Sequence, residues 1–338
     1  MKTKLAVLMA GVIVAAGTLV FAEQAEFSLS KDMQDKIDAI PKDIVAKMEA
    51  NLPAEAAAKV EKPRKLVVFI ASKGYYHDSI PVAALALKKM GDKLKTWDTT
   101  LTDDEALFSK ENLAKFDGIF MDNTVGEHPA NGAGQKQARQ DFLDYIKAGH
   151  GLMGTHAATD CNHPWPEYFE MIGAEFTNHQ FFQIGVKNED PDNPINACFG
   201  GKGFAFDDEI YNFKMVPKDK TNGYSRDRVH VLLSFQGENT KQWDTGTRPL
   251  KGNPPRTDND YAVSWTKSYG AGRVFYCSLG HNRTDFANSV LLKHYLAGIQ
   301  YALGDLKADA TPSAQLPADR KMAEAPKWDD KAASLVNK

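Results

Sequence analysis

Short apolar runs alternate with amphipathic segments through the first half of the chain, and this alternation constrains the fold more than any other feature. The run RKLVVFIAS, over residues 64–72, is apolar without interruption, as expected of a strand that is buried on both faces. The two kinds of segment then follow in this order: helix 82–91, strand 94–100, helix 109–116, strand 117–123, helix 135–150 and strand 151–157. Strands that alternate with helices predict an α/β fold in which helices sandwich a parallel sheet. Beyond residue 176 the chain is richer in strands, and residues 288–304 form a final amphipathic helix.

Polar loops follow the strands at 64–72, 117–123 and 151–157. In parallel α/β sheets, ligands bind beyond the carboxyl ends of the strands, so we expect these loops to line one cleft. In the last of these three segments, 151–157, the chain is expected to turn sharply at Gly154 and then to begin a helix. His156 then stands where many α/β enzymes place a nucleophile.

The chain ends differ from the central region in composition. Lys2 and Lys4 precede an apolar run, and this pattern predicts a signal peptide over 1–22 that is cleaved after Ala22. Export to the periplasm or the extracellular space follows from it, and an uncleaved membrane anchor is the alternative.

The sequence divides further into three parts. Residues 23–63 are expected to form one or two short helices and a linker, with little apolar surface to bury. Residues 64–306 form the main domain. Residues 307–338, which are rich in Ala, Pro and charged residues, are expected to be a disordered tail.

Composition and missing motifs exclude several functions. The formal net charge of −3 gives no basic surface for nucleic acid. The sequence has neither a GxSxG elbow nor a dinucleotide fingerprint after the first strand, so no nucleotide cofactor is expected. The three cysteines, at 161, 198 and 277, allow one disulfide but no disulfide scaffold or zinc ribbon. The sequence does not indicate an oligomeric state.

Histidines and carboxylates gather at the expected turns, and the cluster consists of His77, Asp78, His156, Asp160, His179, Asp208, Glu209 and His281. Side chains of these types bind divalent metals such as zinc or manganese, or carry out acid/base chemistry. The alternative is that individual histidines cap helices or bond backbone carbonyls. Trp165 and Tyr168 are suited to stacking on a sugar ring, although a packed helix start explains them equally well.

Several ordered blocks resemble the ThuA-like family, which is named for trehalose utilisation. They include ASKGYYHDSIP, GHGLMGTHAATD, YFEMIGAEFTNH, DDEIYNF and DYAVSWTKSYGAGRVFYCSLGH, and the resemblance runs from about Lys65 to Leu306. It implies the flavodoxin-like fold of class I glutamine amidotransferases. In those enzymes a catalytic cysteine occupies the turn at which His156 stands here, and Cys161 lies beyond it. Histidine cannot form the glutamyl thioester, so glutaminase activity is not expected.

The same resemblance implies a role in carbohydrate catabolism, with 3-keto glycosides or disaccharides as substrates. A 3-keto group acidifies the proton at C2, and loss of that proton can expel the group at C1. The hypothesis assigns His156, His179 and His281 as metal ligands or acid/base groups, with His156, His281 and Glu209 as the catalytic set. The expected sugar-binding residues are His77, Asp78, Asp160, Trp165 and Tyr168.

Three functions therefore stay open. The first is an exported enzyme that acts on modified sugars by elimination, hydrolysis or isomerisation. The second is a non-catalytic carbohydrate-binding protein of the envelope. The third is a metal-dependent hydrolase with an unrelated substrate.

Overall fold

The computed structural model describes residues 27–130, 132–215, 220–242 and 258–336. The signal peptide expected over 1–22 lies outside these residues. Within the described ranges, no helix has the length and apolar character needed to cross a membrane.

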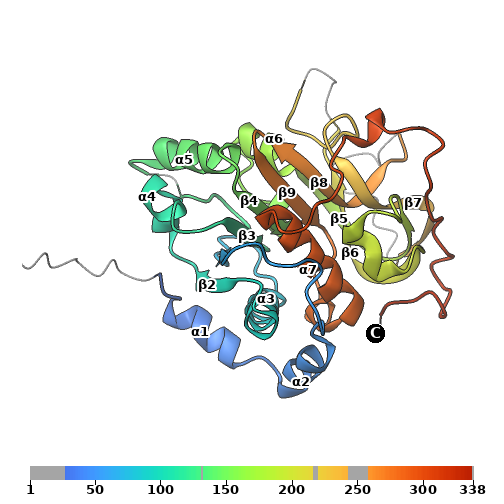
Figure 1. The fold of residues 1–338 in the computed structure, drawn as a ribbon, viewed down its shortest axis with the longest axis horizontal. Helices are drawn as coiled ribbons and strands as arrows, with labels where there is room; N and C mark the ends of the chain where they lie inside the picture. The colour runs from blue at the N-terminus through green and yellow to red at the C-terminus, as the bar shows by residue number, and fades with distance from the viewer. Residues whose placement is uncertain (1–26, 131, 216–219, 243–257, 337–338) are drawn as a thin grey trace, which may run out of the picture.

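A single nine-stranded sheet organises the chain, in the order β2-β1-β3-β4-β9-β8-β7-β5-β6 (Figure 1). Five strands are parallel: β1 Lys65–Phe69, β2 Asp98–Thr102, β3 Gly118–Asp122, β4 Gly151–Thr155 and β9 Gly272–Cys277. Four strands continue the sheet in antiparallel fashion: β5 Phe176–Asn188, β6 Phe204–Phe213, β7 His230–Gln242 and β8 Tyr261–Tyr269. The parallel half confirms the predicted α/β sheet, and the antiparallel half corresponds to the strand-rich second part of the sequence.

Helices cover both faces of the parallel strands. Leu66 and Val68 of β1 pack into a core with α3 (Ile80–Leu94) and α7 (Ser289–Leu303). Val67 and Phe69 pack on the opposite side, in a core shared with the following helices: α4 Lys110–Leu113, α5 Gln135–Lys147 and α6 Pro166–Ile172. Because alternate residues of β1 enter two different cores, the strand is apolar at almost every position. Short 3₁₀ helices lie at η1 Glu105–Phe108, η2 His156–Thr159, η3 Pro194–Phe199, η4 Asp285–Ala287 and η5 Ser313–Gln315.

Gly91 does not end its helix, contrary to the sequence-based expectation. Helix α3 continues to Leu94, and Lys95 follows in the left-handed region with φ 56°. A Cβ at Gly91 would lie 2.5 Å from Nε1 of Trp97. The glycine therefore permits close packing of Trp97 against the helix.

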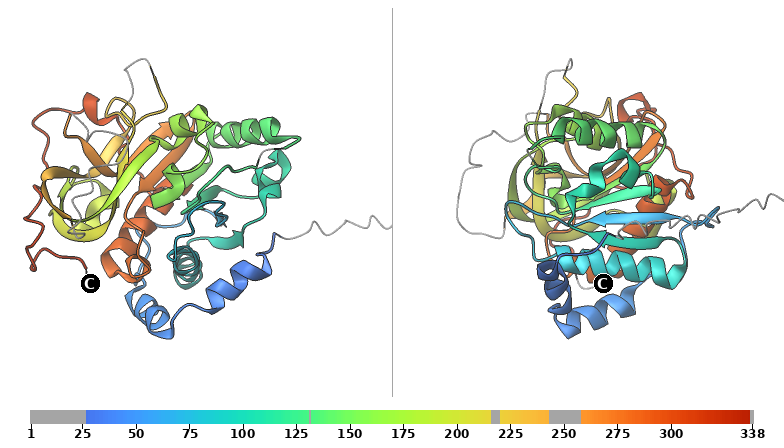
Figure 2. Two further views of the ribbon diagram at one scale, coloured as in Figure 1. Left: turned by 180° about the vertical axis from the view of Figure 1, so that it is seen from behind. Right: turned by 90° about the vertical axis from the view of Figure 1, so that its left-hand side faces the viewer.

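The N-terminal segment packs on the main domain. Its helices are α1 (Lys31–Asp38) and α2 (Lys42–Asn51), which lie along α3 and the end of α7 (Figures 1 and 2). Met33 and Met48 are buried in the same core as α3 and α7, so the segment buries more than its composition suggested. The guanidinium of Arg64 then donates to the carboxylate of Asp305, with Nε 2.9 Å from Oδ1.

Residues 307–336 of the C-terminal tail have defined positions, so the expectation of disorder is wrong for them. The backbone of the tail pairs with the sheet: Ala323 and Asn188 exchange two hydrogen bonds, and Ala205 of β6 bonds both Ala333 and Leu335. Composition did not reveal this order because the partners of the tail are backbone groups of distant strands.

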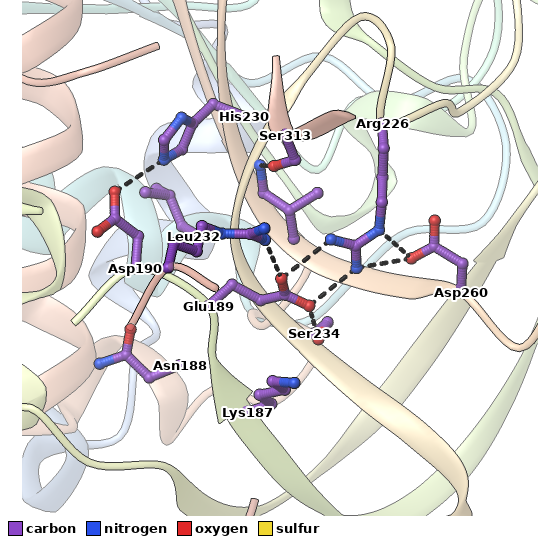
Figure 3. Close-up of polar contacts among 12 residues, drawn as sticks. Lys187, Asn188, Glu189, Asp190, Arg226, His230, Leu232, Ser234, Asp260 and Ser313 are labelled. Atoms are coloured by element: carbon purple, nitrogen blue, oxygen red, sulfur yellow. Dashed lines mark hydrogen bonds and ion pairs between the residues drawn. The ribbon is translucent and has the colours of Figure 1, made fainter. Parts of the chain in front are cut away.

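Polar contacts fix the tail further. The Glu189 carboxylate accepts hydrogen bonds from the side chains of Arg226 and Ser234, and Ser313 of the tail lies nearby (Figure 3). Arg320 of the tail also donates to Glu189, at 2.8 Å. A buried carboxylate shared by two guanidinium groups thus holds the tail against the sheet.

Candidate functional site

His156 occupies the sharp turn directly after β4. The strand runs through Thr155, past the expected turn at Gly154, and His156 itself has a positive φ of 42°. Its imidazole is fully buried, and Nδ1 lies 2.8 Å from the carbonyl oxygen of Ser278. A carbonyl only accepts, so Nδ1 carries the proton and a neutral ring presents a lone pair at Nε2.

Two other parallel strands bring histidines to the same edge of the sheet. His77 lies between β1 and α3 and is buried, and His281 follows β9. The His77 and His156 rings have centroids 4.9 Å apart, and His281 lies 5.2 Å from each of them. The loops after β1 and β4 therefore meet, as predicted, and the loop after β9, which was not among the three predicted loops, joins them.

Glu209 reaches the histidines from the antiparallel half of the sheet. It lies within β6, so the expectation that Asp208 and Glu209 occupy a turn is wrong. Its Oε2 is 3.0 Å from Nε2 of His156 and 3.2 Å from Nδ1 of His281. Although β6 is at the end of the strand order, the curled sheet places its centre against the end of β4.

Asp208 supports this arrangement from the neighbouring position. Its buried carboxylate accepts from the Gly280 amide at 2.8 Å and from the Asn282 side chain at 3.0 Å. Asp208 therefore ties the loop that carries His281 to the strand that carries Glu209. Burial raises the pKa of Asp208 above its ordinary value, while nearby His156 and His281 oppose that shift.

Four side chains form a compact group, which we call the His/Glu centre: His77, His156, Glu209 and His281. One potential ligand atom from each lies within 4.8 Å of all the others. Nδ1 of His77 is buried and has no hydrogen-bond partner. A histidine that has a buried, unpaired ring nitrogen and lies against a carboxylate and two other imidazoles is typical of a cation site.

Burial and mutual charge set the protonation of this centre. Desolvation, with His156 and His281 nearby, lowers the pKa of His77 to about 3. Burial alone would raise the pKa of Glu209, but its hydrogen bonds to His156, His179 and His281 lower it well below the ordinary value. Burial opposes protonation of His281, yet the hydrogen bond and charge of Glu209 raise its pKa above the ordinary value.

His179 lies beside the centre but outside its four ligand positions. It projects from β5, not from a turn, and its Nδ1 is 2.6 Å from Oε1 of Glu209. Its side chain is 45% exposed, in contrast to the buried His156. Glu209 therefore contacts His156 and His281 with one carboxylate oxygen and the more exposed His179 with the other.

The remaining predicted residues divide into two groups. Asp78 is exposed and pairs with Arg283, while Asp160 bonds Nε2 of His163 at 3.0 Å and does not join the centre. Trp165 and Tyr168 are buried in the core under α6, so they cannot stack on a sugar. Their aromatic area stabilises the packing of that helix, which was the alternative explanation.

Cys161 is a buried core residue. Burial raises the pKa of its thiol to about 12, which leaves almost no thiolate near neutral pH. All three cysteines are free thiols. The structure therefore gives Cys161 no features of a nucleophile.

Three contributors escaped the sequence analysis: the Ser278 carbonyl that fixes the His156 tautomer, the Tyr211 ring 4.0 Å from the His156 ring, and the exposed Tyr75 beside His77. A carbonyl has no sequence signal, and Tyr211 looks like any strand aromatic. Tyr75 had a signal, because it lies in the polar loop that follows the first strand.

Comparisons with known proteins agree with this architecture. The model of the ThuA family, described as trehalose utilisation, matches residues 65–302. A ThuA-like protein from Bacteroides uniformis ATCC 8492 is 18% identical, with a TM-score of 0.51 over 72% of this chain and 93% of its own. A ThuA-like protein from Parabacteroides merdae ATCC 43184 is 17% identical, with a TM-score of 0.49 over 76% of this chain and 94% of its own. No match was found among curated proteins. The first structural likeness, together with the family match, confirms the glutamine amidotransferase-like fold.

Proposed function

The chain belongs to the ThuA family, and on that premise we propose that it is a carbohydrate-processing enzyme of the lyase or hydrolase type with 3-keto glycosides or disaccharides as substrates. The family gives the broader role, which is carbohydrate utilisation with a small sugar as ligand. The observation that carries the proposal is the His/Glu centre at the carboxyl ends of β1, β4 and β9. A site of this kind can bind a cation and move protons.

The donor set fits a divalent transition metal. Nδ1 of His156 donates to Ser278, so the lone pair of Nε2 faces the carboxylate oxygen of Glu209 at 3.0 Å. Two acceptors at this distance repel unless a cation, either a proton or a metal ion, lies between them. Ligand atoms about 2.0–2.2 Å from one zinc ion lie no more than about 4.4 Å apart, close to the spread of this group.

The Ser278 carbonyl contributes as an outer partner of the centre. Metal-binding histidines usually donate their second ring N–H to a carbonyl or a carboxylate, which fixes the tautomer and the ring orientation. His156 has this arrangement. We therefore assign His77, His156, His281 and Glu209 as the residues that would hold zinc or manganese, with His179 outside the set.

When bound, the metal would stabilise negative charge on a substrate oxygen. His179 is assigned the proton transfer, because Oε1 of Glu209 holds its Nδ1 and its ring reaches the surface. In the proposed elimination His179 takes the C2 proton, and the C–H electron pair forms a C2–C3 double bond as the C3 carbonyl becomes an enolate. The C3 carbonyl then re-forms, and the C2–C3 π pair moves to C1–C2 and expels the oxygen at C1 with the C1–O bonding pair. The leaving oxygen takes the proton from His179. The products are an unsaturated keto sugar and an alcohol, with no change in oxidation level overall.

We also propose that the protein acts outside the cytoplasm. The support is the charged start and apolar run within the first 22 residues. N-terminal sequencing of the protein from its native host tests this, with a mature chain that starts at Glu23 as the expected result. A chain that retains Met1 in the soluble fraction would contradict export.

Metal analysis by mass spectrometry, combined with turnover of a 3-keto disaccharide, tests the proposed function. We expect stoichiometric metal in the wild type and its loss in Glu209→Gln and in a His156→Ala/His281→Ala variant. His163→Ala is the matched control, since His163 also pairs with two carboxylates, Asp160 and Glu175, but lies outside the centre. His179→Ala should keep the metal and lose turnover. Saturable sugar binding without product would refute the enzyme and favour a binding protein, and metal-free active wild type would refute the metal.

A further inference from the structure

Tyr75 is an exposed aromatic side chain beside His77 and His281 of the His/Glu centre. It is 66% exposed, and Met215 is the only other large hydrophobic residue that is exposed in the described part of the chain. A hydroxyl of Ser72 donates to the Tyr75 carbonyl at 3.0 Å, which holds the loop backbone. An exposed aromatic residue beside a cluster of histidines and a carboxylate is more informative than one elsewhere on a surface, because ligand sites combine aromatic rings with a few convergent polar groups.

The rings around Tyr75 have a defined arrangement. The Tyr75 ring is nearly parallel to that of His281, with 16° between their planes and 6.5 Å between centroids. His77 is nearly perpendicular to both, at 4.8 Å from Tyr75 and 5.2 Å from His281. A flat ligand that stacks on Tyr75 therefore lies next to two members of the centre.

Charged groups lie along the chain beside this aromatic face. Asp78 follows His77 in the chain. Arg283, two residues after His281, donates a hydrogen bond to the Asp78 carboxylate at 2.5 Å. Both side chains stay exposed, at 63% and 42%. Their oxygens and N–H groups can accept and donate hydrogen bonds to ligand hydroxyls.

We propose that Tyr75 is a stacking platform that binds one face of a pyranose ring and holds it next to the His/Glu centre. A pyranose whose ring hydroxyls are all equatorial presents C–H groups on both faces, and these pack well on an aromatic ring. An axial hydroxyl places a polar group on one face and weakens stacking there. Asp78 and Arg283 bind the equatorial hydroxyls at the ring edge. This inference rests on the proposed sugar-processing function and adds the residue that positions the sugar ring.

Ligand-observed NMR titrations of the metal-loaded full-length protein test the platform. The probes are methyl β-D-glucopyranoside, in which every substituent is equatorial, its C4 epimer with an axial hydroxyl on one face, and its C3 epimer with an axial hydroxyl on the other. We expect Tyr75→Ala to weaken glucoside binding about tenfold, the loss of one aromatic contact, whereas Tyr75→Phe stays within about twofold. Met215→Ala, the matched exposed control, should bind as the wild type does. One epimer should bind the wild type more weakly than the glucoside, and that difference should vanish in Tyr75→Ala.

Three results would overturn the platform: equal glucoside affinity in Tyr75→Ala and the wild type, an equal loss in Tyr75→Phe, or no saturable binding by the wild type. The proposed function is judged separately, because metal content and turnover of the keto sugar are measured on variants of Glu209 and His179. If the protein binds metal and turns over the keto sugar, but Tyr75→Ala leaves the glucoside affinity unchanged, only the platform is refuted.

Discussion

Gly280 provides a sharp test of how tightly the fold holds His281. A Cβ at this position would lie 2.6 Å from Oγ1 of Thr155 and 3.2 Å from the Phe286 ring. Neither neighbour can move easily, because Thr155 bonds the Tyr295 hydroxyl at 2.6 Å and Phe286 is fully buried. The Gly280 backbone is also fixed, since its amide donates to Asp208 and its carbonyl accepts from Ser79.

The added methyl group in Gly280→Ala should therefore strain the site, because neither its neighbours nor its backbone can move to make room. Overpacking of this kind costs about 1–3 kcal/mol, which corresponds to a fall in Tm of roughly 1.5–4.5 °C for a chain of this size. Movement of the backbone at residue 280 should also displace His281 and weaken metal binding. Differential scanning calorimetry and a metal titration measure the two effects.

Gly132→Ala is the matched control, because a Cβ there meets nothing within 4 Å. It should change the unfolding free energy by less than about 0.5 kcal/mol. If both variants have the same Tm and the same metal affinity, the loop is not held as the structure indicates and the reasoning is refuted.

Three further substitutions test other parts of the fold. Asp305→Asn breaks a buried ion pair with Arg64 and should cost about 3–5 kcal/mol in urea unfolding, whereas a loss below about 1 kcal/mol would show a solvated pair. Burial lowers the pKa of His294 from 6.5 to about 4, so the unfolded chain takes up a proton that the native state excludes. Stability should fall by up to about 3 kcal/mol as the pH drops from about 6.5 to about 4, and His294→Gln should remove that dependence; parallel pH curves for the two proteins would contradict it. Tyr168→Phe removes a donor to the Ala158 carbonyl and should cost about 1–3 kcal/mol without changing sugar affinity, so weaker sugar binding would restore Tyr168 as a ligand residue.

The parallel half of the sheet was readable from sequence for a physical reason. Strands such as β1 and β4 are covered on both faces, so their apolar runs are continuous and unambiguous. The chain order of strands and helices then fixes the edge at which the loops meet. His77, His156 and His281 follow parallel strands or their loops, so their meeting could be predicted before any coordinates.

Glu209 and His179 could not be placed in the same way. They lie inside β6 and β5, at positions where a pattern of apolar and polar residues predicts only a strand or a turn. What holds Glu209 in a buried position is a set of histidines far away in the sequence, and local patterns do not record such contacts. The tautomer of His156 depends likewise on the Ser278 carbonyl, which any residue at that position would supply.

The C-terminal tail is another region in which local sequence does not record contacts with distant residues. Truncation of Leu335 tests whether the tail is packed. Composition predicts disorder for residues 307–338, and a leucine in a disordered tail can be truncated at no cost. In the structure Leu335 is buried, its carbonyl accepts from Asn288, and its amide bonds Ala205 of β6, the strand that carries Glu209. Leu335→Ala should therefore cost about 2–5 kcal/mol, measured by urea unfolding. Val336→Ala, at the adjacent and partly exposed position, should cost less than about 1 kcal/mol. The tail pairs with β6, the last strand of the sheet, at Ala205, so loss of Leu335 should increase hydrogen exchange in β6 before it affects β1. Equal stability of the two variants would mean that composition, and not the paired backbone, describes the tail.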